Sequence, residues 1–202
     1  MSNNYPVYEK PLSPNQYYDR NFDIEAVKIL PGEYFVSASD MLLVTVLGSC
    51  VAACIRDRIS GIGGMNHFML PGESSDILSA STRYGTYAME KMINDILKMG
   101  AKRVNLEAKL FGGGNVVRGI TMGNVGGRNA EFAQQYLHTE KITVVAQDLL
   151  DIYPRKVYFF PKNGKVLVKK LRNIPNDTIF KREQIYSTRL KVTDVQGDVE
   201  LF

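Results

Sequence analysis

A cysteine and a histidine lie near each other in the chain, in surroundings that suit covalent chemistry. Cys50 ends the stretch Thr45-Val46-Leu47-Gly48-Ser49-Cys50, and His67 follows in Gly63-Gly64-Met65-Asn66-His67. The whole chain contains only two cysteines and two histidines. A thiolate nucleophile beside an imidazole base can hydrolyse an amide through a thioester. The first hypothesis is therefore a cysteine hydrolase.

Cys50 follows a glycine-serine break in an apolar strand. Glycine lets the backbone turn sharply and leaves room for a substrate. If the chain enters a helix there, free backbone N–H groups would lower the thiol pKa and could hold an oxyanion. The alternative is that Cys50 is a small buried hydrophobic residue, as most free cysteines are. The residues alone leave both interpretations open, whereas Cys54 sits inside an apolar run and is interpreted as core.

Two further residues would complete such a site. The imidazole of His67 could take the Cys50 proton and return it to a leaving amine. Taken alone, a histidine in a predicted strand is more often a buried side chain bonded to a backbone carbonyl. Thr45 could orient His67 and fix its tautomer, although threonine is also simply a favourable strand residue. His138, near the end of a predicted helix, is interpreted as a surface residue.

Glycine-rich segments and possible metal ligands give weaker signals. The segment from Gly112 to Asn115 lacks the spacing of a phosphate-binding loop, so a tight loop bordering a cleft is favoured. The segment from Gly126 to Asn129 is favoured as a turn with Asn129 as a helix cap, rather than as an anion site. Two isolated histidines and a C-x3-C pair form neither a metal ligand set nor a disulfide framework. No cofactor and no metal are expected.

The composition is that of an ordinary globular protein. The chain has 202 residues, of which 45% are hydrophobic and 23% charged, so one main domain is expected. The net charge of +4, from 25 basic and 21 acidic residues, is too mild to favour a nucleic-acid partner. The N-terminus resembles no secretory leader, and no apolar run reaches the ~20 residues that cross a bilayer. We expect a cytoplasmic protein with reduced thiols and no membrane insertion.

Hydrophobic periodicity predicts strands and helices in a mixed order. Strands are expected over 33–38, 41–47, 62–70, 104–111 and 142–149, with a hairpin of 157–160 and 166–171 around Asn163-Gly164. Residues 51–56 could form a strand or a short helix. Helices are expected over 78–99 and after Arg128. This order predicts an α+β (mixed α/β) fold, with a layered mixed β-sheet and two main helices.

The two ends of the chain differ in composition from its centre. Residues 1–22 are polar and rich in tyrosine, asparagine and proline, which is typical of a flexible arm. Residues 23–172 carry the periodic pattern and are predicted to form the catalytic domain. Residues 173–202 are predicted to form a charged C-terminal extension that is loosely held or helical.

In their order along the chain, these segments resemble the CheD family of chemoreceptor glutamine deamidases from bacterial chemotaxis. The likeness rests on Gly32-Glu33-Tyr34, on Thr45-x-Leu47-Gly48-Ser49-Cys50-Val51 and on the segment from Gly63 to Pro71 that contains His67. It continues through Leu106-Glu107-Ala108-Lys109, Phe111-Gly112-Gly113-Gly114 and the segment from Asn124 to Asn129. It covers roughly residues 30 to 170. The cysteine and histidine segments are specific as a pair.

The resemblance implies a protein-glutamine glutaminase that converts selected glutamines of methyl-accepting chemotaxis receptors to glutamates. Cys50 would be the nucleophile, His67 the base and acid, and Thr45 the third member of the triad. The same chemistry could also hydrolyse glutamate methyl esters. The implied fold is the layered arrangement of deamidating cysteine-hydrolase toxins. The implied partners are the receptors and a CheC-type phosphatase, and no cofactor is required.

Two other functions remain open at this point. The chain could be a non-catalytic module that keeps the scaffold and binds a CheC-type phosphatase or a receptor. It could also be a different cysteine hydrolase that acts on a small amide. Retention of Cys50, His67 and Thr45 favours the deamidase but does not exclude a dominant binding role.

Overall fold

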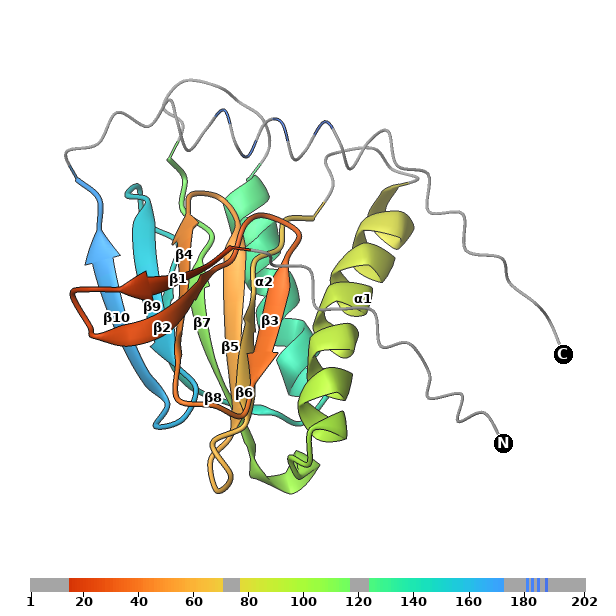
Figure 1. Ribbon diagram of the computed structural model, residues 1–202. Coiled ribbons are helices and arrows are strands. Elements are labelled where there is room, and N and C mark those ends of the chain that lie inside the picture. Colours follow the sequence, from red (N-terminus) through yellow and green to blue (C-terminus); the bar gives the residue numbers. More distant parts are fainter. Residues whose placement is uncertain are drawn as a thin grey trace, which may run out of the picture.

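The computed structural model describes residues 15–70, 77–116 and 124–172, together with Lys181, Glu183, Ile185 and Thr188 (Figure 1). The first six strands are β1 (Gln16–Asp19), β2 (Ile24–Lys28), β3 (Tyr34–Ser37), β4 (Leu42–Leu47), β5 (Val51–Asp57) and β6 (Gly63–Asn66). The remaining elements are α1 (Ile77–Lys98), a 3-10 turn η1 (Arg103–Asn105), β7 (Leu106–Gly112), α2 (Val125–Thr139), β8 (Thr143–Leu149), β9 (Arg155–Phe160) and β10 (Lys165–Lys170).

The strands form two five-stranded sheets. Sheet I has the order β1-β2-β4-β9-β10, and sheet II has the order β3-β6-β5-β7-β8. Most neighbours are antiparallel, but β2 pairs with β4 in parallel and β7 pairs with β8 in parallel. Both sheets are therefore mixed, which confirms the predicted α+β fold with layered mixed sheets and two main helices.

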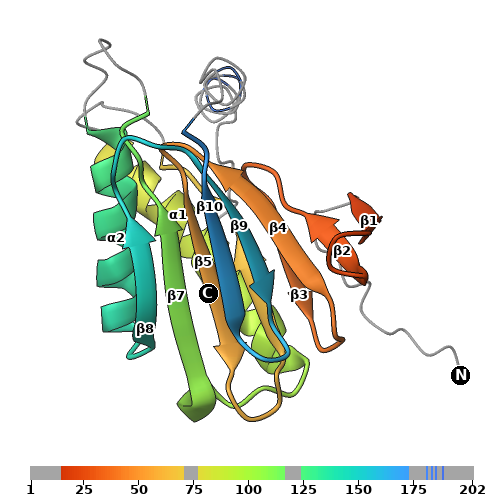
Figure 2. The ribbon, with the colours of Figure 1, turned by 90° about the vertical axis from the view of Figure 1, so that its left-hand side faces the viewer.

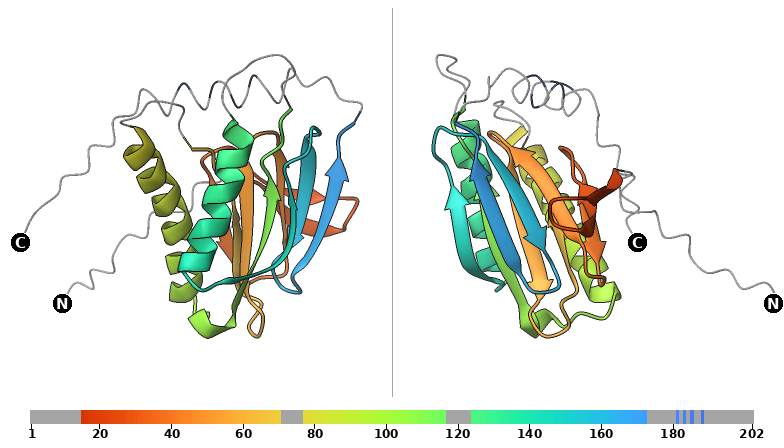
Figure 3. Two further views of the ribbon diagram at one scale, coloured as in Figure 1. Left: turned by 180° about the vertical axis from the view of Figure 1, so that it is seen from behind. Right: turned by 60° about the vertical axis from the view of Figure 1, so that its left-hand side comes forward.

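The molecule has three layers, with sheet II in the middle. Both helices cover one face of sheet II, and sheet I covers the other face (Figure 2). Seen from behind, α1 and α2 lie next to each other across sheet II (Figure 3). A strand in a middle layer must be apolar on both faces, because neither face contacts water. Every residue of β5 except Arg56 is buried, as this arrangement requires.

Side chains of β5 alternate between the two halves of the core. Val51, Ala53 and Ile55 face the helices, where they pack in one cluster with α1 residues such as Met92. Ala52 and Cys54 face sheet I and pack in the cluster that contains Val157 and Phe159. This alternation follows from the two-residue period of a strand. It places the side chain of Cys50, which directly precedes β5, in the core between the two sheets.

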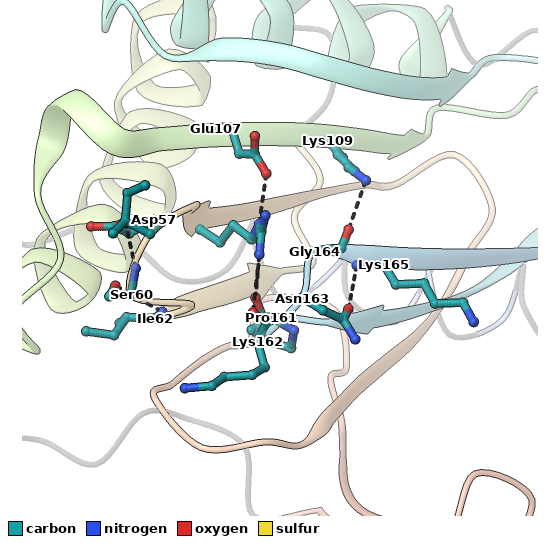
Figure 4. A network of polar contacts seen from close by, with 12 residues as sticks. Asp57, Ser60, Ile62, Glu107, Lys109, Pro161, Lys162, Asn163, Gly164 and Lys165 are labelled. Carbon is teal, nitrogen blue, oxygen red and sulfur yellow. Dashed lines mark hydrogen bonds and ion pairs between the residues drawn. The ribbon is translucent and has the colours of Figure 1, made fainter.

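Polar contacts join the two sheets near the end of β5 that lies farthest along the strand from Cys50. The Nε of Arg56 lies 2.8 Å from Oε1 of Glu107, and the Nη1 of Arg56 donates to the carbonyl oxygens of Pro161 and Lys162. The Nζ of Lys109 donates to the carbonyl oxygen of Gly164, at 2.8 Å (Figure 4). The β9–β10 turn of sheet I is thereby tied to β5 and β7 of sheet II.

Most predicted elements are confirmed, with shifts of a few residues at their ends. Residues 51–57 form a strand and not a short helix. The strand predicted over 62–70 is shorter, since β6 ends at Asn66 and only a single bridge at Phe68 continues it. Within the described ranges, neither α1 nor α2 combines the length and apolarity needed to cross a bilayer.

The ends of the predicted domain are only partly described. Gln16–Asp19 forms β1 and pairs with β2, although the composition had assigned these residues to a flexible arm. Residues 1–14 and most of 173–202 lie outside the described residues. Lys181, Glu183, Ile185 and Thr188 have helical backbone. The division into arm, catalytic domain and extension otherwise stays a prediction.

Candidate active site

The segment from Gly48 to Cys50 carries the chain from one sheet to the other. β4 ends at Leu47 in sheet I, and β5 begins at Val51 in sheet II. Cys50 therefore precedes a strand, and of the two alternatives left open for the residues after it, a strand or a short helix, the strand is the one that forms. Its side chain is fully buried.

The three carbonyl groups of this crossover are each held by a hydrogen bond. The carbonyl of Gly48 accepts from the N–H of Gly114 at 2.8 Å, and the carbonyl of Cys50 accepts from the N–H of Gly113 at 2.7 Å. The carbonyl of Ser49 accepts from the side-chain amide of Asn129 at 2.9 Å. Because each peptide plane is fixed through its carbonyl, the directions of the intervening N–H groups are fixed as well.

The N–H groups of the crossover converge on the carboxylate of Glu183. Its Oε1 accepts from the N–H of Gly48 at 3.0 Å and from the N–H of Cys50 at 3.2 Å. Its Oε2 accepts from the N–H of Ser49 at 3.1 Å and from the Ser49 hydroxyl at 2.6 Å. Glu183 is only 7% exposed. The crossover thus forms a buried site for a carboxylate, made mainly of backbone donors.

Two glycines allow the end of β7 to approach the crossover closely. Gly112 has φ +111°, and a Cβ atom there would collide with the carbonyl oxygen of Cys50. Gly113 has φ +66°, and a Cβ atom there would lie 2.7 Å from the carbonyl oxygen of Gly126. Side chains at either position would push β7 or α2 away from Cys50. The glycine segment therefore supports the backbone of the site.

A threonine and a histidine from different sheets are joined by a hydrogen bond. The Oγ1 of Thr45, on β4, lies 2.8 Å from the Nδ1 of His67, which follows β6. The same hydroxyl donates its only hydrogen to the carbonyl of Ile29, at 2.8 Å. It must therefore accept from His67, so Nδ1 carries a proton and Nε2 has a free lone pair. Among the described residues, His67 Nε2 has no hydrogen-bond partner.

The strand register places His67 and Cys50 on the same face of sheet II. Val51 and Phe68 are opposite each other in an antiparallel bridge, and both point toward the helices. Cys50 and His67 precede them, and consecutive side chains alternate between faces, so both point toward sheet I. They are diagonal neighbours on adjacent segments. Residues in such positions typically lie about 7–8 Å apart, which is within reach of long side chains. The geometry brings Thr45, Cys50 and His67 to one part of the core.

Burial and the Glu183 charge govern the protonation of this site. Burial raises the pKa of the Cys50 thiol well above its usual value, and the charge of Glu183 and a hydrogen bond to it raise that pKa further. Burial lowers the pKa of His67 to about 4, although the Glu183 charge acts in the opposite direction. At neutral pH the site therefore holds a protonated thiol and a neutral imidazole, so the thiol is stored in its unreactive form.

The other residues singled out in the sequence lie elsewhere. Cys54 is buried in the core and unbonded to Cys50, and burial raises its pKa. His138 is exposed in the last turn of α2. Asn129 is not the helix cap that the sequence suggested, because Asn124 caps α2 by accepting from the N–H of Gly127. No group of three or more His, Cys, Asp or Glu side chains suited to a metal ion occurs within the described part of the chain.

Two residues of the site were missed by sequence reasoning. Asn129 is buried, donates to the Ser49 carbonyl and accepts from the N–H of Leu70 at 2.8 Å. Glu183 lies in the extension, where charged residues are frequent. A polar residue next to glycines was the only local signal for Asn129, and no local signal distinguishes Glu183 from other glutamates.

Comparison with known proteins gives a consistent result. The family model described as CheD chemotactic sensory transduction matches residues 69–170. A protein from Thiobacillus denitrificans, named "Probable chemoreceptor glutamine deamidase CheD", is 64% identical over 197 residues, which span 96% of this chain and 98% of the relative. A protein of the same name from Janthinobacterium sp. is 63% identical over 194 residues, which span 95% of this chain and 96% of the relative.

More distant relatives carry the same description. A protein from Shewanella oneidensis named "Probable chemoreceptor glutamine deamidase CheD 1" is 57% identical over 192 residues, which span 94% of this chain and 93% of the relative. The family match and the nearly full-length identities agree with the resemblance seen in the motifs around Cys50 and His67. The chain belongs to the CheD family.

Proposed function

We propose that this protein deamidates glutamine side chains of methyl-accepting chemotaxis receptors, with Cys50 as nucleophile, His67 as base and acid, and Thr45 as the residue that orients His67. The names of the nearly full-length relatives support the reaction and the receptor substrate. The observation that carries the residue assignment is the Thr45–His67 hydrogen bond, which leaves Nε2 of a buried imidazole free on the same face as Cys50. The reaction contributes to adaptation in chemotaxis.

In the proposed first step, the glutamine amide enters the site beside Cys50. The thiol proton passes to Nε2 of His67, and Sγ attacks the amide carbon. The carbonyl oxygen becomes an oxyanion, and the N–H groups of the Gly48–Cys50 crossover are placed to stabilise it, since they already bind carboxylate oxygens. His67 then protonates the leaving nitrogen, which departs as ammonia.

In the proposed second step, water hydrolyses the thioester. His67 takes a proton from water, the hydroxide attacks the thioester carbon, and Sγ leaves and regains its proton from His67. The product is a glutamate side chain. Thr45 keeps the proton of His67 on Nδ1 throughout, so that Nε2 alone exchanges protons with the reacting atoms. The same steps would hydrolyse a glutamate methyl ester, with methanol leaving in place of ammonia.

The proposed substrate is a folded receptor. An exposed glutamine of the receptor must therefore reach the buried thiol of Cys50. A CheC-type phosphatase is the second proposed partner, by the family resemblance. The alternative function is a non-catalytic module that binds such a phosphatase or a receptor on the same scaffold. Retention of a thiol, an oriented imidazole and backbone oxyanion donors in one place favours the enzyme over the module.

Intact-mass analysis of receptor cytoplasmic fragments tests the proposal. Fragments incubated with the native protein should gain the mass difference between an amide and an acid at selected glutamines. Fragments incubated with Cys50→Ala should not change, whereas Cys54→Ala, which alters a buried thiol in the core, should retain the activity. Unchanged fragments with the native protein, together with retained phosphatase binding, would establish the binding module instead.

A further inference from the structure

The site of the proposed reaction is occupied by a side chain of the protein itself. Glu183 presents its carboxylate to the N–H groups of Gly48, Ser49 and Cys50 and hydrogen bonds to the Ser49 hydroxyl. Lys181, Glu183, Ile185 and Thr188 have helical backbone. Glu183 is buried, while Lys181, Ile185 and Thr188 are exposed.

The chemistry of Glu183 matches the product of the proposed reaction. Deamidation of glutamine yields glutamate, so the product has the same side chain as Glu183 and the substrate differs from it only in one terminal group. The two carboxylate oxygens share four donors at the point where the oxyanion and the departing group would lie. A glutamate on a helical segment therefore sits as a deamidated receptor glutamate would sit.

Burial is the main reason that the Cys50 thiol is held in its unreactive form, and Glu183 adds to it. The carboxylate places a negative charge and a hydrogen-bond acceptor next to the Cys50 thiol, and both favour the protonated thiol. The Glu183 carboxylate would repel a second negative charge on Sγ. Its described contacts with the crossover include no basic side chain that would offset this repulsion. The occupied site is thus blocked sterically and disfavours the thiolate electrostatically.

We propose that Glu183 is a product mimic in cis: it occupies the subsite for the glutamine side chain and keeps the enzyme inactive until a receptor segment displaces it. This inference rests on the proposed deamidase function and adds its regulation. The ligand class of the subsite is a glutamine or glutamate side chain on a helical surface. Because the competitor is part of the same chain, its effective concentration is high, and only a well-matched receptor surface replaces it.

Thiol alkylation measures the occupancy of the subsite without any receptor. Iodoacetamide should modify Cys50 at least about tenfold faster in Glu183→Ala than in the native protein, because removal of the carboxylate uncovers the thiol and lowers its pKa. Fragmentation of the peptide that carries both thiols distinguishes modification at Cys50 from modification at Cys54. Glu131→Ala removes an exposed glutamate of α2 and should leave the alkylation rate unchanged. Equal Cys50 alkylation in Glu183→Ala and the native protein, with both folded by circular dichroism, would overturn the proposal.

Receptor deamidation provides the functional readout. Glu183→Ala should raise kcat/KM for receptor fragments, because the internal competitor is gone. A fall in kcat/KM, despite faster alkylation, would show that Glu183 assists the reaction and would overturn the inhibitory role. Failure of the proposed function looks different. In that case the native protein would leave receptor fragments unchanged, or Cys50→Ala would deamidate them equally well, while Glu183→Ala would still change Cys50 alkylation.

The variant Glu183→Gln converts the product mimic into a substrate mimic. Sγ of Cys50 should attack the new amide, ammonia should leave with the proton carried by His67, and water should release the acid and restore the thiol. The purified protein should therefore carry glutamate at position 183. The double variant Glu183→Gln with Cys50→Ala should retain glutamine there, as located by fragmentation against the neighbouring Gln184. Retained glutamine with Cys50 intact, or conversion without it, would overturn the assignment.

Discussion

Thr45 and His67 come from different sheets, and their 2.8 Å hydrogen bond fixes which imidazole nitrogen is free. Thr45→Val keeps the shape of the side chain but removes this bond and leaves the carbonyl of Ile29 without its donor. We expect kcat for receptor deamidation to fall about fivefold or more, since one hydrogen bond corresponds to roughly 1 kcal/mol. Thr45→Ser retains the hydroxyl and should keep most of the activity. Equal kcat for Thr45→Val and the native enzyme would contradict the orienting role.

The protonation of His67 can be followed by NMR, because the chain has only two histidines and the exposed His138 can be assigned by substitution. Burial lowers the pKa of His67 from 6.5 to about 4, against the opposing effect of Glu183. The unfolded chain binds this proton below pH 6.5 and the folded chain only below about pH 4. Stability should therefore decrease as pH falls from 6.5 to 4, and this component should vanish in His67→Gln. A His67 titration near 6.5 would contradict the buried neutral imidazole.

Asn124 caps the start of α2 and Asn129 lies within α2, and their side chains make different hydrogen bonds. Asn129→Ala leaves the carbonyl of Ser49 and the N–H of Leu70 unpaired in the core, which should cost roughly 1–3 kcal/mol and disturb the crossover beside Cys50. Asn124→Ala removes only the helix cap and should cost about 1 kcal/mol. Urea unfolding and receptor deamidation should separate them. Asn129→Ala should lose activity in the folded state, whereas Asn124→Ala should not.

Gly112 and Gly100 both have positive φ but differ in the space around them. Gly112→Ala would drive a methyl group into the carbonyl of Cys50, whereas a methyl group at Gly100 would lie 4.0 Å from its nearest neighbour, Ile62. Gly100→Ala should cost about 1–3 kcal/mol from backbone strain alone. Gly112→Ala should cost more and should abolish deamidation. Equal stability losses in thermal unfolding would show that the close approach at Gly112 is unimportant.

Asp57 should make the fold sensitive to acid at the end of β5 far from Cys50. Burial opposes ionisation, but the N–H groups of Ile59, Ser60 and Lys102 and the amide of Asn105 outweigh it and lower the pKa to about 2. Stabilisation by the carboxylate is full above the unfolded pKa of 3.8 and is lost as pH falls toward 2. Asp57→Asn should unfold more easily at pH 5 and show a weaker pH dependence between 4 and 2. Identical profiles would contradict this prediction.

Local pattern was sufficient for much of the fold. The apolar stripe of α1, the alternation in β7 and the Asn163-Gly164 turn each reflect the spacing of neighbouring residues, and the corresponding elements are present. Residues 51–56 were ambiguous because a strand buried on both faces has no alternation to distinguish it from a buried helix. Only its place as a middle strand between two layers decides the matter.

The sequence by itself determined the chemical groups of the site: a cysteine after a glycine, a histidine after a second glycine segment, and the family to which their order belongs. The tertiary structure decided their relations. Pairing of two sheets brings Thr45 to His67, and packing of α2 brings Asn129 to Ser49. Glu183 reaches Cys50 across 133 positions of the chain. Contacts of this kind depend on how distant elements assemble, and no short-range period in the sequence encodes them.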